Sequence, residues 1–323
     1  MRKIILIVII FLLFFSFGCT PDTGESSVDY RKGTQGIVMN FMTDIPPAKM
    51  YDNMPIDLVV EIRNRGAYPQ PNLLTGWAIN VISPNAKGIG TLYLSGFDNT
   101  LIAGMPKQIS IPKFEGKSPY NLEGGYDVVS FRGNIINFDS RNIDTYDANF
   151  LVTSCYNYET IASQTVCVDP EPYSTKEKTK VCTIPPSYSL SGGQGAPVAV
   201  TKIEETVLSN KIQFKIYMKN LGDGKVIDKN RLNIDCPYSL DYTNLDRIYV
   251  SGRVSGYSLS CKPRNPILLT KGEGSVICTI PKPVMSKSAY TTPLQVNLEY
   301  GYSSSIQRSV EILNTPWLTE KFI

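Results

Sequence analysis

The feature that most constrains the fold of this chain is an internal repeat. Three segments recur in one order and pair as 56–69 with 212–225, 104–113 with 272–282 after one gap, and 150–168 with 294–312. The third pair aligns without a gap and places Tyr156 on Tyr300 and Tyr158 on Tyr302. Three matched blocks in the same order predict two copies of one structural unit.

Each copy of the repeat contains a strand pattern. Apolar residues occupy every second position in both copies, at Ile56, Leu58, Val60 and Ile62 and at Ile212, Phe214, Ile216 and Met218. A period of two indicates a strand with one face in a core. The 19 tyrosines, 22 prolines and 24 glycines also favour strands and turns over helices. The sequence therefore predicts an all-β protein of two tandem sandwich domains.

The chain divides at changes in composition. We expect the first domain over 36–169, with an insertion at 118–149, and the second over 196–323. Between them, 170–195 is rich in proline, serine, glycine and charge, which is typical of a linker. Its GGQG run at 192–195 precedes a strand rather than a helix, so we interpret it as a flexible hinge and not as a phosphate loop.

These motifs resemble a known class of surface domain. In both copies a strand is followed by asparagine and glycine, and then by a later glycine and a further strand. This pattern is similar to that of the CARDB-like and related immunoglobulin-like domains of archaeal and bacterial surface proteins. The two copies, the second opening with QGAPVAVTKIEE, resemble archaeal surface lipoproteins built in this way. The resemblance implies a pair of immunoglobulin-like β-sandwiches on the cell surface, with roles in adhesion or in the envelope.

The N-terminal segment predicts export. Residues 1–18 begin with two positive charges and continue with an uncharged apolar run, as a signal peptide or membrane anchor does. Cys19 follows Gly18 and precedes a polar tether over 19–35, a pattern that resembles the lipidation site of a lipoprotein. Lipidation at Cys19, an uncleaved anchor and plain secretion all place the remaining chain outside the cytoplasm. The first two attach it to the outer face of the membrane.

The other six cysteines form an even set, which in an exported chain indicates disulfides: Cys155, Cys167, Cys182, Cys236, Cys261 and Cys278. Free thiols and a zinc site are the alternatives, although the chain has no C-x-x-C pair and no histidine.

Local arguments limit the possible disulfide pairings. Cys155 and Cys167 lie symmetrically about Ile161 in what we expect to be the last hairpin of the first domain, so they would face each other across it. Alternation places Cys155 on the outer face of that sheet. Cys261 and Cys278 both have inward parity, so these two would pair, or one of them would pair with Cys236. Cys182 needs a partner in either domain.

Composition and motifs argue against several functions. The net charge is +3, and two positive charges belong to the N-terminal segment, so we expect no nucleic-acid partner. No histidine, no nucleophile motif and no phosphate loop followed by lysine is present, so we expect no enzyme and no cofactor.

Four oxygen-bearing residues in the expected insertion, Asp139, Asn142, Asp144 and Asp147, are candidates for a calcium site or for a pair of catalytic carboxylates, with a solvated loop as the plainer interpretation.

Aromatic residues divide into expected core and expected surface. Trp77 and the repeated Tyr156, Tyr158, Tyr300 and Tyr302 have core parity, so we interpret them as packing residues. Tyr120, Tyr126 and Tyr146, in the expected insertion, are better candidates for contacts with a partner.

The function we expect is that of a non-enzymatic, membrane-anchored surface protein that presents two β-sandwiches to an envelope protein, a glycan or another cell. A second hypothesis is a ligand-capture lipoprotein with a concave pocket between the domains. The third is a surface hydrolase that uses carboxylates.

Overall fold

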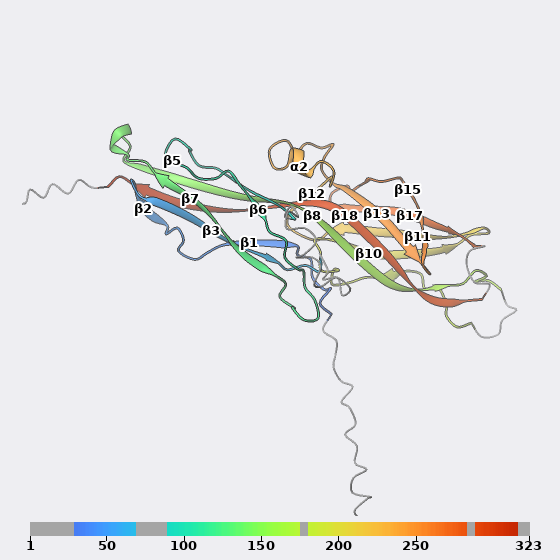
Figure 1. The fold of residues 1–323 in the computed structure, drawn as a ribbon. Helices are drawn as coiled ribbons and strands as arrows, with labels where there is room; N and C mark the ends of the chain where they lie inside the picture. The colour runs from blue at the N-terminus through green and yellow to red at the C-terminus, as the bar shows by residue number, and fades with distance from the viewer. Residues whose placement is uncertain (1–28, 69–88, 175–179, 283–287, 316–323) are drawn as a thin grey trace, which may run out of the picture.

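The computed structural model describes residues 29–68, 89–174, 180–282 and 288–315. These residues form an all-β protein with three sheets, in which every strand pairing is antiparallel except that of β2 (Lys49–Tyr51) with β18 (Tyr290–Leu313) (Figure 1). Two short helical turns, η1 (Asp139–Arg141) and α2 (Leu232–Asp235), complete this part of the chain. No helix among the described residues is long and apolar enough to cross a lipid bilayer.

Two long strands form the axis of the molecule. β8 (Thr145–Val168) and β18 have 24 residues each, and they pair from Thr145 opposite Leu313 to Val168 opposite Tyr290. The expected hairpin about Ile161 was wrong, because residues 150–168 belong to this single strand. Ile161 is flanked by ETIASQ, which contains none of the glycine, proline, asparagine or aspartate that a tight turn favours.

The long pair lies within a nine-stranded sheet. Its order is β14-β13-β18-β8-β4-β6, and β12, β16 and β2 join at the sides. The bounds of the added strands are β4 (Gly90–Ser95), β6 (Gln108–Ile111), β12 (Lys225–Ile227), β13 (Arg247–Val254), β14 (Tyr257–Ser258) and β16 (Ile267–Leu268). We call this the central sheet.

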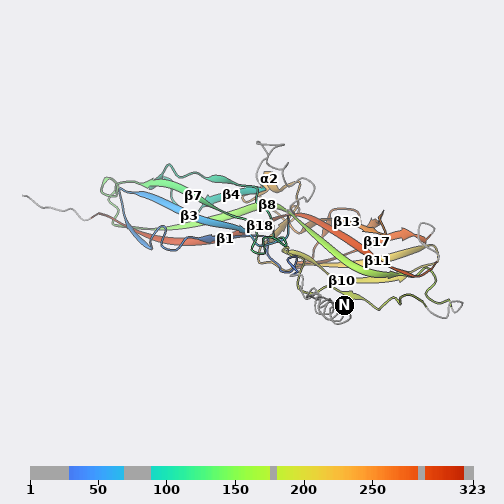
Figure 2. The ribbon, with the colours of Figure 1, turned by 60° about the horizontal axis from the view of Figure 1, so that its bottom comes forward.

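Two smaller sheets lie at opposite ends of the central sheet (Figure 2). The four-stranded sheet has the order β1 (Ile37–Phe41), β3 (Pro55–Asn64), β7 (Tyr126–Ile135) and β5 (Ile102–Ala103). The five-stranded sheet has the order β15 (Ser260–Lys262), β17 (Glu273–Pro281), β11 (Lys211–Asn220), β10 (Val198–Val207) and β9 (Tyr188–Ser189).

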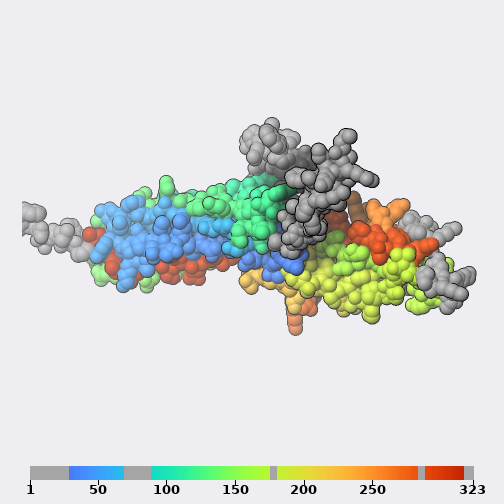
Figure 3. All heavy atoms as spheres, turned by 90° about the horizontal axis from the view of Figure 1, so that it is seen from below, coloured from blue at the N-terminus to red at the C-terminus, as the bar shows by residue number. Residues whose placement is uncertain are grey.

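The molecule therefore has two halves that share the long strands. The N-half contains the four-stranded sheet with residues 145–156 of β8 and 302–313 of β18, and the C-half contains the five-stranded sheet with the remainder of both strands. Figure 3 shows the halves end to end, blue and green in one and yellow to orange in the other. One continuous apolar cluster fills both, from Ile37 and Phe131 to Phe214 and Ile280.

The repeat appears as a local two-fold relation. Tyr158 pairs with Tyr300 and Tyr156 with Tyr302, so the relation is centred on the Asn157–Gly301 pair. β1, β3, β7 and β5 of the N-half correspond to β10, β11, β17 and β15 of the C-half, because both sets pair in that order. The two matched blocks at 56–69 and 150–168 are thus structural equivalents of their partners.

The third matched block and the expected insertion need correction. Residues 104–113 contain β6 in the central sheet, whereas 272–282 contain β17 beside β11, so the two segments are not equivalent. The strand that occupies the place of β17 in the N-half is β7. It lies within 118–149, which is therefore not an insertion but supplies a core strand and the beginning of β8.

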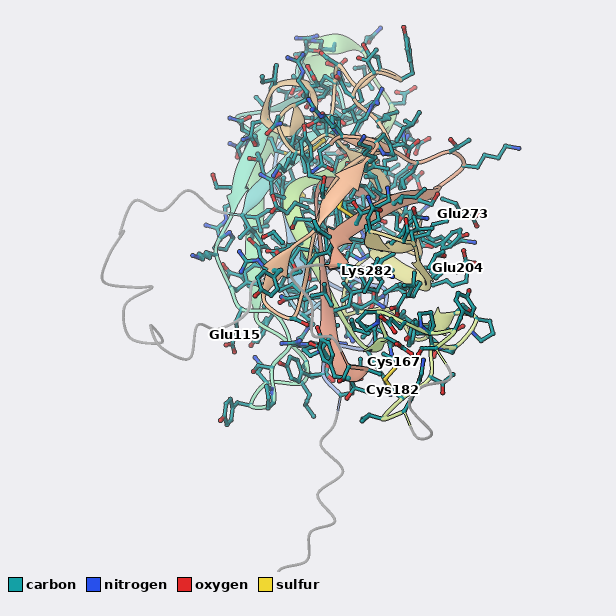
Figure 4. All side chains as sticks on the ribbon, turned by 90° about the vertical axis from the view of Figure 1, so that its right-hand side faces the viewer. Glu115, Cys167, Cys182, Glu204, Glu273 and Lys282 are labelled. Carbon is teal, nitrogen blue, oxygen red and sulfur yellow. A yellow bond between two sulfur atoms is a disulfide. The ribbon has the colours of Figure 1, made fainter. Side chains whose placement is uncertain are left out.

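The expected linker at 170–195 is tied to the rest of the protein. Its residues 188–189 form β9, and Cys182 is bonded to Cys167 (Figure 4). The GGQG run is also fixed, since the Gly195 N–H donates to the Gly33 carbonyl at 2.9 Å and the Ala67 N–H to the Gly195 carbonyl at 2.6 Å. A flexible hinge at 192–195 was thus wrong. The domain boundaries themselves stay predictions, but β8 and β18 run through both halves.

Candidate functional site

Four buried tyrosines mark the centre where the halves meet. Tyr156, Tyr158, Tyr300 and Tyr302 are at most 3% exposed, and their ring centroids lie 5.8–6.4 Å apart in neighbouring pairs. All four have even residue numbers in β8 and β18, so their side chains point toward the smaller sheets. Their tilted and edge-to-face contacts are the arrangements that aromatic rings prefer. The interpretation of these residues as packing residues is confirmed.

Tyr158, on the C-half part of β8, reaches across to organise the turn after β3 in the N-half. Its hydroxyl donates to Asn64 Oδ1 at 3.0 Å and accepts the Tyr68 N–H at 3.4 Å. Asn64 also accepts the Gly66 N–H at 3.2 Å and donates through Nδ2 to the Tyr68 carbonyl at 2.7 Å. The asparagine and glycine that recur in the sequence therefore shape a turn that a core tyrosine recognises.

The turn after β11 in the C-half repeats this arrangement with Tyr302, which lies on the N-half part of β18. The Tyr302 hydroxyl donates to Asn220 Oδ1 at 3.2 Å and accepts the Gly224 N–H at 2.8 Å. Asn220 Nδ2 donates to the Gly224 carbonyl at 2.9 Å. A Cβ atom at Gly222 would approach the Tyr302 hydroxyl to 2.4 Å, so glycine is required there for close approach.

A cavity of about 340 Å³ opens beside these tyrosines, and we call it the N-half groove. Residues 34–39 form one wall, residues 304–306 of β18 form the opposite wall, and the loop 221–224 of the C-half closes one end. Tyr156 and Tyr302 lie at its base. Leu221, which is 36% exposed, and the half-buried Ile306 supply apolar surface, while Ser304 and Thr34 supply hydroxyl groups.

The electrostatics of the groove favour neutral hydrogen bonding. Burial raises the pKa of Tyr156 well above its ordinary value, and burial likewise raises the pKa of Tyr302. Both phenols therefore keep their protons near neutral pH. Among the described residues that line the groove, the exposed Asp223 is the one that carries a carboxylate. This arrangement can bind neutral polar or polypeptide groups.

A second cavity, of about 300 Å³, lies in the C-half against Ile161, Ser163 and Gln164 of β8. Ile161 of β8 is the repeat equivalent of Ser305 of β18, so the two cavities share one corresponding position. Here, however, residues 190–194 of the expected linker form one wall.

All six candidate disulfide cysteines are bonded, in the pairs Cys155–Cys236, Cys167–Cys182 and Cys261–Cys278. The third pair is one of those we expected, and its cysteines are direct cross-strand partners. The expected Cys155–Cys167 bridge was wrong, because both cysteines lie on one continuous strand.

The outward parity of Cys155 is confirmed by its surroundings. It lies in a small apolar cluster with Cys236, Ile227 and Leu232, separate from the main core. The segment that carries α2 covers this outer surface, so Cys155 is only 3% exposed. Parity alone could not reveal a covering segment on the outer face.

The candidate calcium residues lie at the far tip of the N-half. Asp139 and Asn142 belong to the η1 turn, and Asp147 is exposed on β8. Asn314 donates to Asp139 Oδ1 at 2.8 Å and, through its N–H, to the Asp144 carbonyl at 2.9 Å. In the described part of the chain, no three histidine, cysteine, aspartate or glutamate side chains gather as a metal site would require.

The expected contact tyrosines differ in their exposure. Tyr120 is 89% exposed, and Tyr126 is 61% exposed with the Arg63 guanidinium 4.8 Å from its ring centroid. Tyr146 is half-buried, and its hydroxyl accepts the Asp98 N–H at 2.8 Å, so it is the least suited to a partner. Trp77 and the lipidation candidate Cys19 lie outside the described residues.

Sequence reasoning missed a buried polar cluster at the end of β10. Glu205 is 9% exposed, and the Tyr188 hydroxyl donates to its Oε2 at 3.3 Å while accepting the Cys167 N–H at 2.9 Å. Burial, and secondarily the charge of Asp169, raise the pKa of Glu205 to about 8. Lys180 pairs with Asp169 at 2.6 Å. The inward parity of Glu205 with Ile203 was the signal that could have found it.

Comparisons with known proteins add little to this geometry. No family model and no curated protein matches the chain. Among solved structures, the chain is similar to the collagen-binding domain of surface protein RspB from Erysipelothrix rhusiopathiae, at 8% identity over 88% of this chain and 94% of that one. The TM-score is 0.15, a similarity too low to carry an argument about fold or function.

Proposed function

We propose that this chain is a non-enzymatic protein of the outer cell surface, anchored at its N-terminus through a lipid on Cys19. Its two copies would be tandem immunoglobulin-like sandwiches, related to the CARDB-like class, that bind a protein or glycan of the envelope. The observation that carries the proposal is that all six cysteines of the described residues are paired in three disulfides. Such bonds persist outside the cytoplasm and are rare within it.

The N-half groove supports a binding role in particular. It is concave, its apolar side chains lie beside neutral hydroxyl groups, and its two base tyrosines have pKa values raised by burial. These properties suit recognition rather than proton transfer, for which a group titrating near the working pH is favoured. The exposed Tyr120 and Tyr126 offer a second, flatter contact region at the N-half.

Mass spectrometry of the unreduced protein purified from its own membranes tests this function. We expect a mature chain that begins at Cys19, carries added lipid mass and retains three disulfides. The Cys19→Ser variant should lose the lipid and leave the membrane fraction with its disulfides intact, whereas the Ser16→Ala control should stay attached. A chain that begins at Met1 with free thiols would contradict the proposal.

The second candidate function, capture of a small solute or glycan, is favoured by one observation. The N-half groove is formed by residues of both repeat copies, because 36–39 belong to the first and 221–224 to the second. Native mass spectrometry of the purified protein should then detect a bound small molecule that the Leu221→Arg variant lacks. Bound material that is always polypeptide would exclude this candidate and favour the first.

A further inference from the structure

The outer edge of β1 presents unpaired backbone groups to the N-half groove. The Met42 N–H donates to the Val59 carbonyl at 3.0 Å and the Arg65 N–H to the Gly36 carbonyl at 2.9 Å, so the even-numbered residues of β1 bond to β3. Antiparallel pairing alternates, and the backbone groups of Met39 therefore face away from β3. Within the described ranges, no hydrogen bond reaches the N–H or the carbonyl of Met39.

The opposite wall of the groove is also an open edge. β12 pairs with residues 301–303 of β18 and β2 with residues 311–313, which leaves 304–310 without a neighbour on that side among the described strands. The Glu311 N–H donates to the Ala48 carbonyl, so the odd-numbered residues of β18 direct their backbone groups outward. Ser305, which lines the groove, thus directs its backbone groups outward, and no backbone hydrogen bond to them is found on that side among the described residues.

The equivalent edge in the C-half is closed by the chain itself. Val200 corresponds to Met39, because Val198 pairs with Asn220 as Ile37 pairs with Asn64. The Val200 N–H donates to Gln194 Oε1 at 2.8 Å, and Gln194 Nε2 donates to the Val200 carbonyl at 3.1 Å. The side-chain amide of Gln194 therefore bonds to this edge as a peptide group would.

Further along the same edge, a true strand is added. The Leu190 N–H donates to the Thr201 carbonyl at 2.9 Å, and β9 pairs antiparallel with Lys202 and Ile203 of β10. The strand segment 188–190 and the Gln194 side chain, joined by a turn at Gly192 and Gly193, thus close the C-half edge with backbone and amide bonds. The repeat places the same edge geometry in the N-half, where the described residues provide no such segment.

We propose that the N-half groove receives an extended polypeptide segment of a partner protein, which adds antiparallel to the outer edge of β1. This proposal rests on the proposed surface-binding function and names the class of partner for its groove. Backbone bonds to Met39 would supply affinity, and Leu221 and Ile306 would contact alternate apolar side chains of the segment. An extended polypeptide is the favoured occupant because the molecule already adds a strand, β9, to the equivalent edge of β10, two residues beyond Val200.

A synthetic peptide that copies residues 186–194, PSYSLSGGQ, is the probe for this site. Hydrogen–deuterium exchange of the intact, disulfide-bonded protein should show saturable protection of the amides at 37–42 when the peptide is added. N-methylation at the peptide position of Leu190, whose N–H faces β10 in the protein, should abolish the protection. N-methylation at the position of Ser189, whose N–H faces away from that ladder, should leave it.

Substitutions in the protein complete the test. Ile306→Arg places a charged side chain in the groove and should reduce peptide affinity at least tenfold, whereas Gln307→Arg adds the same charge at the next residue on the other face and should not. Leu221→Arg, on an exposed loop, gives an independent loss if Ile306→Arg lowers stability. Circular dichroism and the unreduced mass establish that each variant is folded.

Several outcomes would overturn the proposal. No protection of 37–42 at millimolar peptide, or protection that both N-methylated peptides cause equally, would show that no strand is added. Protection confined to 198–203 would mean that the peptide displaces the resident C-half segment. Protection that rises with protein concentration alone would identify a second copy of the chain as the occupant. None of these results bears on the lipid at Cys19 or on membrane attachment, so the proposed function is tested separately.

Discussion

At the scale of single residues, the buried carboxyl of Glu205 couples stability to pH. Burial raises its pKa to about 8 in the folded chain from the ordinary value of 4.5 that it has in the unfolded chain. The folded state therefore holds a proton that the unfolded state releases, and stability falls as the pH rises between these two values. One Glu205 oxygen, Oε1, also lacks a hydrogen-bond partner in the described structure.

The Glu205→Gln variant should remove this pH dependence, because the amide is neutral at every pH. We expect it to be more stable than the parent protein at pH 8, by on the order of a few kcal/mol, and nearly equal to it below pH 5. Urea unfolding measured from pH 5 to 8 checks the prediction. The neighbouring Glu204→Gln serves as control, since the Lys202 ion pair lowers the pKa of Glu204 out of this range. A parallel pH profile for parent and Glu205→Gln would contradict it.

The repeated tyrosines allow one hydrogen bond to be compared in two environments. Asn64 is fully buried where Tyr158 contacts it, whereas Asn220 is half-buried where Tyr302 contacts it. Replacing the tyrosine by phenylalanine leaves the asparagine with one hydrogen-bond partner fewer. The loss of stability is greater where water cannot take the place of the missing hydroxyl. Tyr158→Phe should therefore lower the free energy of unfolding by about 1–3 kcal/mol.

The matched variant Tyr302→Phe should cost less, at roughly 1 kcal/mol or below. Denaturant unfolding of both variants under the same conditions gives the comparison. An equal loss in both would indicate that burial of the asparagine does not set the strength of these bonds.

At the scale of elements, the three disulfides should differ in the stability they supply. Cys155–Cys236 closes a separation of 81 residues, compared with 15 for Cys167–Cys182 and 17 for Cys261–Cys278. Closing a longer loop removes more entropy from the unfolded chain. The long bridge also fastens the α2 segment over the outer face of the central sheet, through the cluster of Leu232 and Ile227.

Replacing both cysteines of one bridge by alanine tests this order. We expect the Cys155→Ala, Cys236→Ala protein to lose about 4–5 kcal/mol and the Cys261→Ala, Cys278→Ala protein about 3 kcal/mol. Thermal unfolding of the two double variants, each with its remaining bridges verified by unreduced mass, supplies the comparison. A larger loss from the short bridge would show that native packing, not loop entropy, sets the contribution.

How much could be predicted from the sequence depends on the element. Strict alternation identified β3 and β11 and the inward direction of Cys278, because a half-buried strand leaves that pattern directly in the chain. Alternation also continues from Phe150 through Tyr156 to Val168, but a 24-residue strand lies far outside the usual length, so a hairpin was expected instead. The missing turn residues around Ile161 were the signal that pointed to the longer strand.

The groove could not be found in this way. Whether the edge of β1 is open depends on where 188–194 docks, and the polar composition of that segment is equally typical of a linker. The role of Gln194 is likewise set by tertiary contact with Val200 and leaves no local pattern. Pairings of distant cysteines have the same limit, since Cys155 and Cys236 meet only through the fold.

At the scale of the whole molecule, the shared strands should make the halves unfold together. β8 and β18 each contribute to both halves, and the apolar core is continuous from Phe131 in the N-half to Phe214 in the C-half. Loss of one half would leave a long stretch of paired strand with one bare apolar face. Separate sandwiches on a linker would instead unfold independently.

Two matched core substitutions distinguish these alternatives. Phe131→Ala and Phe214→Ala each remove a fully buried ring, at a cost of about 3–5 kcal/mol. If the halves are coupled through β8 and β18, either variant should lower the temperature of one common transition, and hydrogen exchange should accelerate in the core strands of both halves. Scanning calorimetry would then give a calorimetric enthalpy equal to the van't Hoff enthalpy. Two transitions, each shifted by only one of the variants, would mean that the long strands connect the halves without coupling their stability.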